Sequence, residues 1–142
     1  LFLDEERFSL PLWLSWSGWV LLVVSLAMLV WSLFVNLPFR KTYIASGVGD
    51  RLITNGLYAL VRHPGVHWFS LALVGLVLIT RSIQMLAAVP VFIALDIILV
   101  IVQDRWFFNR MFRDYANYRR VTPMLIPNRR SVRAFIDSLS GV

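Results

Sequence analysis

Two features of the sequence place chemically active side chains next to apolar segments. In the first, Arg62-His63-Pro64, a cation and an imidazole come immediately before an uncharged run. A guanidinium can hold a carboxylate through two parallel N–H donors, and a histidine can accept or release a proton near neutral pH. The residue types fit a second interpretation equally well, in which Arg62 and His63 lie at a membrane surface and contact lipid phosphate.

The second feature is Asp96, a carboxylate inside an apolar segment. A charged side chain in hydrocarbon is costly, so such a residue is a candidate for function. Gln103 follows seven residues later, and an α-helix places residues at this spacing within about 20° of one face. We therefore expect Asp96 and Gln103 to face one cavity. A hydrogen bond between packed helices, or a protonated Asp96 shielded from lipid, also explains the residue.

The composition predicts an integral membrane protein. Hydrophobic residues make up 58% of the 142 residues and charged residues 15%, against about 45–50% and about 25% in soluble domains. A chain this short cannot bury such an excess in a soluble fold. The absence of cysteine excludes disulfides and cysteine nucleophiles, and with two histidines no metal site is expected. The net charge of +6 is attributed to a cytoplasmic membrane face, and no nucleic-acid partner is expected.

The apolar runs predict about three transmembrane helices in one all-α membrane domain, residues 1–142. A short lead-in, residues 1–9, comes before an uncharged run that exceeds the roughly 20 residues needed to cross a bilayer. We place the first span at residues 10–35 and a loop at 38–63. A proline, which suits the first helical turn, opens the second span. The second and third spans, residues 64–80 and 83–103, are predicted to form a helical hairpin.

The C-terminal part is predicted to lie along the membrane surface. Aromatic residues recur at helical spacing in residues 104–120 with arginines between them, which indicates an amphipathic surface helix. Two prolines stop helix formation at the start of the basic tail, residues 121–142. Basic residues are concentrated in the 38–63 loop and after Gln103, with one each at the N-terminus and the hairpin turn. This asymmetry predicts an external N-terminus and a cytoplasmic C-terminus, with Arg62-His63-Pro64 on the cytoplasmic side.

The motifs together resemble a family of membrane methyltransferases. Gly56, Tyr58 and Arg62-His63-Pro64 are followed by the uncharged hairpin and then by Gln103-Asp104. The sequences Met111-Phe112-Arg113-Asp114-Tyr115-Ala116-Asn117-Tyr118, Val121-Thr122-Pro123 and Ile126-Pro127 complete the pattern. In order and spacing, residues 52–127 resemble isoprenylcysteine carboxyl methyltransferase and the phospholipid methyltransferases. Neither half of the pattern is specific alone, but the two halves with the hairpin between them are.

The resemblance implies transfer of a methyl group from S-adenosylmethionine to a lipid-like or prenyl-cysteine-like acceptor. Partners would be membrane lipid and a lipophilic acceptor, and a homo-oligomer is plausible. By this analogy, Arg62 would hold the carboxylate of the cofactor, Asp104 its ammonium, and tyrosine faces its sulfonium. The predicted catalytic residues are Arg62, His63, Gln103 and Asp96. The predicted cofactor-binding residues are Gly56, Tyr58, Arg62, His63, Pro64, Gln103, Asp104, Tyr115 and Tyr118.

Several departures from the family pattern leave alternatives open. Gln103 stands where the family has a first glutamate, Leu57 replaces a proline, and Val66 replaces a tyrosine. We hypothesise that Asp96 supplies the charge that Gln103 lacks. One alternative is a catalytically degenerate family member that acts as a membrane scaffold or lipid-binding protein. Another is an NADPH-dependent membrane reductase of the steroid-reductase type. The sequence leaves open the acceptor, the oligomeric state and any further helices upstream.

Overall fold

A computed structural model describes residues 6–36, 53–112 and 114–140 of the chain. Most of the predicted loop at residues 38–63, the start of the lead-in, and Arg113 lie outside these residues. Within them, the regular secondary structure is helical, and an isolated antiparallel bridge joins Arg7 to Ser82.

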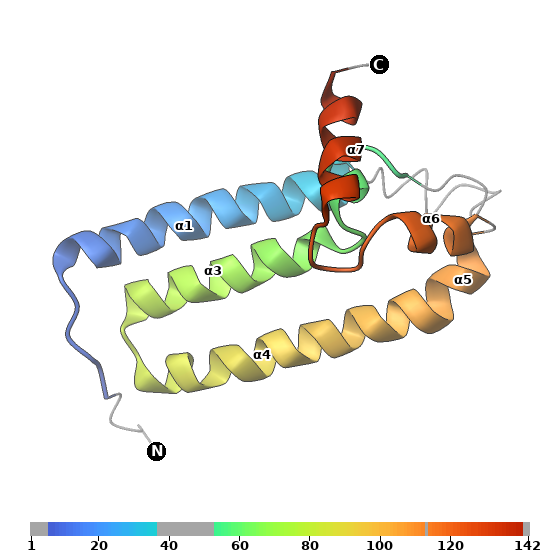
Figure 1. Cartoon of the computed structure of the whole chain (residues 1–142). Coiled ribbons are helices and arrows are strands. Elements are labelled where there is room, and N and C mark those ends of the chain that lie inside the picture. The colour runs from blue at the N-terminus through green and yellow to red at the C-terminus, as the bar shows by residue number, and fades with distance from the viewer. Residues whose placement is uncertain (1–5, 37–52, 113, 141–142) are drawn as a thin grey trace.

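The three longest helices of the described residues run side by side, with α3 between α1 and α4 (Figure 1). Helix α1, Leu12–Val30, continues into a π-helical turn, η1, Trp31–Asn36. Helix α3 spans Pro64–Thr80 and helix α4 spans Ile83–Val102. Two helical stretches, Leu12–Phe34 and Ile83–Arg110, are long and apolar enough to cross a membrane, whereas α3 is shorter. The predicted all-helical fold is confirmed for the described residues, and the predicted number of spans, including the second span at residues 64–80, stays a prediction.

Glycines bring α1 and α3 into close contact. A Cβ atom on Gly18 would lie 2.8 Å from Leu78 Cβ and 3.0 Å from Gly75 O. A Cβ atom on Gly75 would lie 3.0 Å from the backbone nitrogen of Leu22. Small residues at such contacts are typical of membrane helices, because they let two backbones approach each other. A larger residue at Gly18 or Gly75 therefore requires these helices to separate.

The turn between α3 and α4 is held by the N-terminal segment. Arg81 adopts the left-handed conformation (φ 56°) that ends α3. The Ser82 Oγ then accepts a hydrogen bond from Met85 N (3.3 Å), which caps the start of α4. Phe8 N donates to Arg81 O (2.9 Å) and Ile83 N donates to Glu6 O (3.1 Å). The N-terminal segment thus lies against the hairpin turn, at the opposite end of the bundle from the C-terminal helices (Figure 1).

The C-terminal part differs from the single helix expected over residues 104–120. A π-helical turn, η3, Gln103–Phe107, leads into α5, Phe108–Met111, and the backbone then becomes extended at Phe112 (φ −122°, ψ 122°). Helix α6 spans Tyr115–Val121. The break turns Phe112, Tyr115 and Tyr118 inward, where all three are buried against one another. Burial of these rings favours a bent chain over a straight surface helix.

A further helix lies within the segment expected to be a basic tail. Helix α7 spans Arg129–Leu139. The Asn128 side chain accepts a hydrogen bond from Ser131 N (2.9 Å), and the Ser131 Oγ accepts one from Asn128 N (3.0 Å). This reciprocal capping box starts the helix immediately after Pro127, because it satisfies backbone donors that the helix leaves unpaired.

Candidate active site

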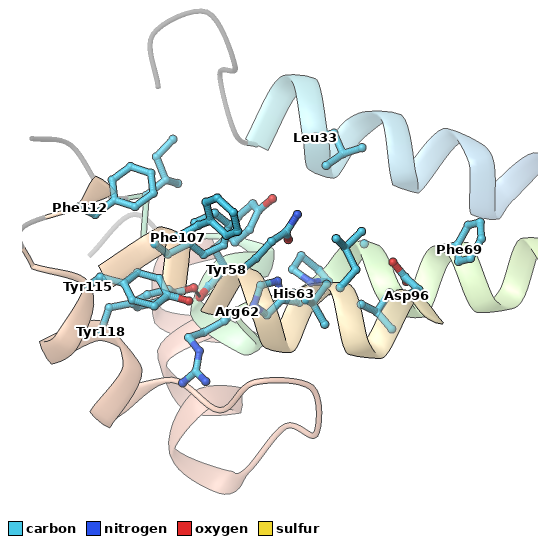
Figure 2. Close-up of a pocket in the computed structure, with 18 of the residues that line it drawn as sticks. Leu33, Tyr58, Arg62, His63, Phe69, Asp96, Phe107, Phe112, Tyr115 and Tyr118 are labelled. Carbon is cyan, nitrogen blue, oxygen red and sulfur yellow. Dashed lines mark hydrogen bonds between the residues drawn. The ribbon is translucent and has the colours of Figure 1, made fainter. Parts of the chain in front are cut away.

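A cavity of about 770 Å³ lies at the end of the bundle that carries the C-terminal helices. Leu29 and Leu33 line one side, and Leu99 and Gln103 line the side formed by α4 and η3. Helix α3 contributes Phe69. Figure 2 shows Phe69 and Asp96 together at one end of the group, and Phe112, Tyr115 and Tyr118 at the other. The cavity therefore joins an apolar region between the long helices to an aromatic, polar region near the predicted membrane surface.

A buried ion pair between Arg62 and Asp104 forms the centre of the polar region. Arg62 Nε donates to Asp104 Oδ1 (2.8 Å), and a terminal guanidinium nitrogen, Nη2, donates to Oδ2 (3.1 Å). The other terminal nitrogen, Nη1, donates to the carbonyl oxygens of Arg119 (2.9 Å) and Thr122 (2.7 Å). Arg62 is 8% exposed and Asp104 2%. Through this bidentate pair and the two carbonyl contacts, the segment before α3 is connected to η3, α6 and the segment after α6.

Asp104 accepts further hydrogen bonds from the surrounding side chains. The Tyr115 hydroxyl donates to Oδ1 (2.5 Å), and His63 Nε2 lies 3.4 Å from the same oxygen. Arg119 Nε lies 3.4 Å from Oδ2. A neutral His63 with its proton on Nε2 can donate here, because the carboxylate can only accept. These contacts satisfy the buried carboxylate, which would otherwise carry a large desolvation cost.

Aromatic rings surround this ion pair, and burial among them determines the charge state of His63, Tyr115 and Tyr118. His63 stacks on Phe108 with centroids 5.8 Å apart, and Phe108 meets Tyr115 edge to face at 5.4 Å. Burial lowers the pKa of His63 below 6.5, and this outweighs the opposing effect of the Asp104 carboxylate. Burial also raises the pKa of the Tyr115 and Tyr118 hydroxyls. His63, Tyr115 and Tyr118 are therefore predominantly neutral at pH 7.

Backbone hydrogen bonds hold the Arg62-His63 segment against the proline-rich segment. Arg62 N donates to Pro123 O (3.0 Å) and His63 N donates to Met124 O (3.2 Å). The preceding short helix α2, Leu57–Leu60, begins after Gly56, whose φ of 58° suits glycine.

Two further contacts fix α2. Tyr118 Oη donates to Tyr58 O (2.6 Å), and Gly56 N donates to Ser138 Oγ (3.1 Å). The C-terminal segments thus form the walls that position the motif residues.

The structure brings most of the predicted site residues to the cavity. Two predicted residues, Gly56 and Asp104, do not line the cavity. Gly56 contacts α7, and the Asp104 side chain is bound to Arg62. The guanidinium of Arg62 binds Asp104 and two backbone carbonyls, and its predicted contact with the cofactor carboxylate stays a prediction. The predicted residues that line the cavity are Tyr58, Arg62, His63, Pro64, Asp96, Gln103, Tyr115 and Tyr118.

Sequence reasoning missed the role of Phe107, Phe108 and Phe112, which also line the cavity. Their helical spacing was a usable signal, but it was attributed to a face on the membrane surface. Leu33 lies in η1, and Gln103 and Phe107 lie in η3, so a π-helical turn borders the cavity on each side. Such turns are frequent at functional sites, because the extra residue changes the direction of the side chains that follow.

The described residues form a helical bundle with two helices long and apolar enough to cross a membrane, and the bundle encloses a chamber large enough for a small ligand. Residues 13–115 match the model of the phospholipid methyltransferase family, and the chain belongs to that family of membrane methyltransferases. The resemblance found from the sequence motifs is confirmed at this level.

Two curated relatives are named for metal resistance. The chain is 34% identical over 115 residues to the cobalt-zinc-cadmium resistance protein CzcN of Cupriavidus metallidurans, covering 79% of this chain and 53% of the relative. It is 32% identical over 85 residues to the nickel-cobalt-cadmium resistance protein NccN of Alcaligenes xylosoxydans xylosoxydans, covering 60% and 40%. The chain thus spans about half the length of these relatives or less. No solved structure matches it.

Proposed function

We propose that this protein transfers a methyl group from S-adenosylmethionine to an amine-bearing lipid held between its helices. The observation that carries the proposal is a continuous cavity that connects the aromatic residues around Arg62 with the apolar region around Asp96. Its volume, about 770 Å³, is within the range of pockets that hold small ligands. Membership of the phospholipid methyltransferase family supports the same reaction.

The polar region suits the cofactor. The faces of Tyr58, Tyr115 and Tyr118 can attract a sulfonium by cation–π interaction, and the Gln103 amide can bond the amino-acid group. Arg62 and Asp104 serve in this proposal as the framework, since they already neutralise each other. When bound, S-adenosylmethionine supplies an electrophilic methyl group. The residues of the chain need mainly to orient the acceptor and exclude water.

The apolar region suits the acceptor. Leu29, Phe69 and Leu99 line it and can accommodate an acyl chain. A lipid ammonium must lose a proton before its nitrogen can attack the methyl group, and Asp96 on the cavity wall can take that proton. The new carbon–nitrogen bond would replace the carbon–sulfur bond of the cofactor, which would leave as S-adenosylhomocysteine. The same carboxylate repels an acceptor that is itself a carboxylate. We therefore favour a lipid amine over a prenyl-cysteine carboxylate.

The distribution of charge supports a cytoplasmic position for the polar region. Arginines are concentrated in the described residues after Gln103, whereas Glu6, Arg7 and Arg81 are the charged residues described at the opposite end. Basic residues near the ends of spanning helices favour the cytoplasmic side. This orientation would expose the cofactor region to the compartment where S-adenosylmethionine is made.

Calorimetric titration of the detergent-purified protein with S-adenosylhomocysteine tests the cofactor. The informative variant is Gln103→Leu, because Gln103 lines the cavity without a role in the Arg62–Asp104 pair. Gln84→Leu is the matched control, since Gln84 is exposed at the other end of α4. We expect binding that Gln103→Leu weakens and Gln84→Leu preserves. No binding by folded protein would support the scaffold alternative, and binding of NADPH in its place would support a reductase.

A transfer assay tests the acceptor. Protein in vesicles is supplied with S-adenosylmethionine labelled in its methyl group, and either phosphatidylethanolamine or a prenylated cysteine is the acceptor. We expect label in the amine lipid and none in the prenylated cysteine. The reverse pattern would contradict the role of Asp96 while leaving the methyltransferase proposal intact.

The names of the two curated relatives suggest a physiological setting. We propose that methylation of membrane lipid by this protein increases tolerance to cobalt and cadmium, the metals shared by both names. Growth of a metal-sensitive bacterium that expresses the chain tests this. Wild-type protein should extend growth to higher metal concentrations, and an Asp96→Asn variant expressed at the same level should not.

A further inference from the structure

Helix α7 differs from the other long helices of the described residues in its direction and its surface. It runs across the direction of α1, α3 and α4, at the end of the bundle where α5 and α6 also lie (Figure 1). One side faces the protein, where it packs on α2, Ser131 is buried and Ser138 Oγ accepts a hydrogen bond from Gly56 N (3.1 Å). A helix in this direction at the end of a membrane bundle lies roughly in the plane of the membrane surface.

An apolar stripe on α7 is left uncovered by the described residues. Val132, Ile136 and Leu139 are 40%, 55% and 68% exposed, and their spacing places them on one face of a helix. With about 3.6 residues per turn, this stripe lies between the side that packs on α2 and the side that carries Arg133. Apolar residues next to arginines are the arrangement of a helix that lies in the headgroup layer.

The same end of the molecule is strongly basic. Among the described residues after Gln103, the exposed acidic residues are Asp114 and Asp137, while Asp104 is buried against Arg62. The exposed arginines there are Arg105, Arg110, Arg119, Arg120, Arg129, Arg130 and Arg133. This excess of positive charge complements anionic lipid headgroups, which attract basic segments close to the membrane surface.

We infer that α7 is a docking helix for anionic phospholipid, with Val132, Ile136 and Leu139 at the boundary of the acyl chains and the neighbouring arginines on lipid phosphates. Because α7 contacts α2 and Gly56, docked lipid also steadies the wall of the cavity that carries Tyr58. The inference depends on membrane association and not on the methyl-transfer reaction.

The absence of cysteine from the sequence makes a site-specific test direct. Ile136→Cys places a nitroxide label on the apolar stripe, and Ala134→Cys places the same label on a different, exposed face of α7. The full chain is reconstituted in nanodiscs of phosphatidylcholine alone or with phosphatidylglycerol. The accessibility of each label to oxygen, which partitions into lipid, and to a water-soluble nickel chelate is measured by electron paramagnetic resonance.

With phosphatidylglycerol present, we expect the label at residue 136 to gain access to oxygen and lose access to nickel, while the label at residue 134 stays accessible to nickel. Changing Arg129 and Arg133 to Gln in the Ile136→Cys chain should reverse part of this shift. Access of nickel to residue 136 in both lipid mixtures would overturn the inference. So would exclusion of both reagents, which would indicate a protein partner or a second copy. Equal oxygen access in the two mixtures would rule out a requirement for anionic lipid.

Discussion

Asp104 and Asp96 lie in the same continuous helical stretch but have opposite environments. Asp104 is 2% exposed and is bonded by Arg62 and Tyr115, with His63 and Arg119 nearby. Asp96 is partly exposed and faces the cavity, and no described residue forms a hydrogen bond or ion pair with it. A carboxylate with all its partners inside the protein stabilises the fold, whereas one without such partners is available to a ligand.

The comparison separates residues that build the site from residues that can act in it. Arg62 comes from the segment between α2 and α3, Asp104 from η3 and Tyr115 from α6, and their bonds hold these parts together. Asp96 and Gln103 line the cavity without taking part in that network. Substitutions in the first group should lower stability, and substitutions in the second should lower activity or binding.

The largest loss of stability is expected for Arg62→Ala. Removal of the guanidinium leaves Asp104 buried without its main partner, and breaking a buried pair in this way costs about 3–5 kcal/mol. Thermal unfolding in detergent, with limited proteolysis of the C-terminal helices, measures the loss. Arg119→Ala is the control, because the Arg119 side chain is 42% exposed and should contribute little. Equal effects of the two variants would contradict the central role of Arg62.

A smaller loss is expected for Tyr115→Phe. The hydroxyl donates to a buried carboxylate, and hydrogen bonds to charged groups contribute about 1.5–3 kcal/mol. Tyr118→Phe removes a hydroxyl that donates to a neutral carbonyl, Tyr58 O, for which about 0.5–1.5 kcal/mol is typical. Denaturant unfolding of the two variants should rank them in this order. The reverse order would mean that Asp104 is protonated or paired differently.

A pH-dependent loss is expected from His63. Because burial lowers its pKa in the folded state, the unfolded chain takes up the proton first as pH falls below about 6.5. The contribution of neutral His63 to stability is complete above that pH and declines as pH falls toward the lowered pKa. Melting temperatures across pH 5–8 should show this slope, and His63→Gln should flatten it. His67→Gln, a change at an exposed position, should retain the slope.

The smallest effect on stability is expected for Asp96→Asn, since no partner in the described residues is lost. Binding of S-adenosylhomocysteine should be unchanged, while methyl transfer should fall by roughly 100-fold or more, as for loss of a general base. Stopped assays on vesicles containing phosphatidylethanolamine measure this. A variant that is markedly less stable than wild type, yet retains full specific activity while folded, would assign Asp96 to the framework.

The sequence predicted those parts of the fold that depend on local pattern. Pro64 and the uncharged run after it gave bounds of 64–80, the same as those of α3. The helical spacing of Asp96 and Gln103 placed both on one cavity, which they line. The pairing of Arg62 with Asp104 could not be found in this way, because it joins residues 42 positions apart through the tertiary fold.

In the C-terminal region, the local sequence pattern does not predict the break at Phe112, but it does contain signals for helix α7. The spacing of residues 104–120 is continuous, so the break at Phe112 depends on the burial of Tyr115 and Tyr118 rather than on a helix-breaking residue. Helix α7, in contrast, had local signals. Asn128 and Ser131 form its cap, and Val132, Ile136 and Leu139 follow at helical spacing. The prolines and arginines nevertheless favoured the prediction of a basic tail.

The contact between Gly18 and Gly75 also determines how the chamber can admit a lipid. Since a Cβ atom on either glycine would lie about 3 Å or less from atoms of the facing helix, α1 and α3 cannot move closer at this contact. Helix α4 forms the opposite wall and exposes Leu95 and Ile98. We therefore expect the chamber to widen by movement of α4. In the proposed reaction, a lipid that exchanges with the bilayer would pass between α1 and α4, which contribute Leu29 and Leu99 to the chamber.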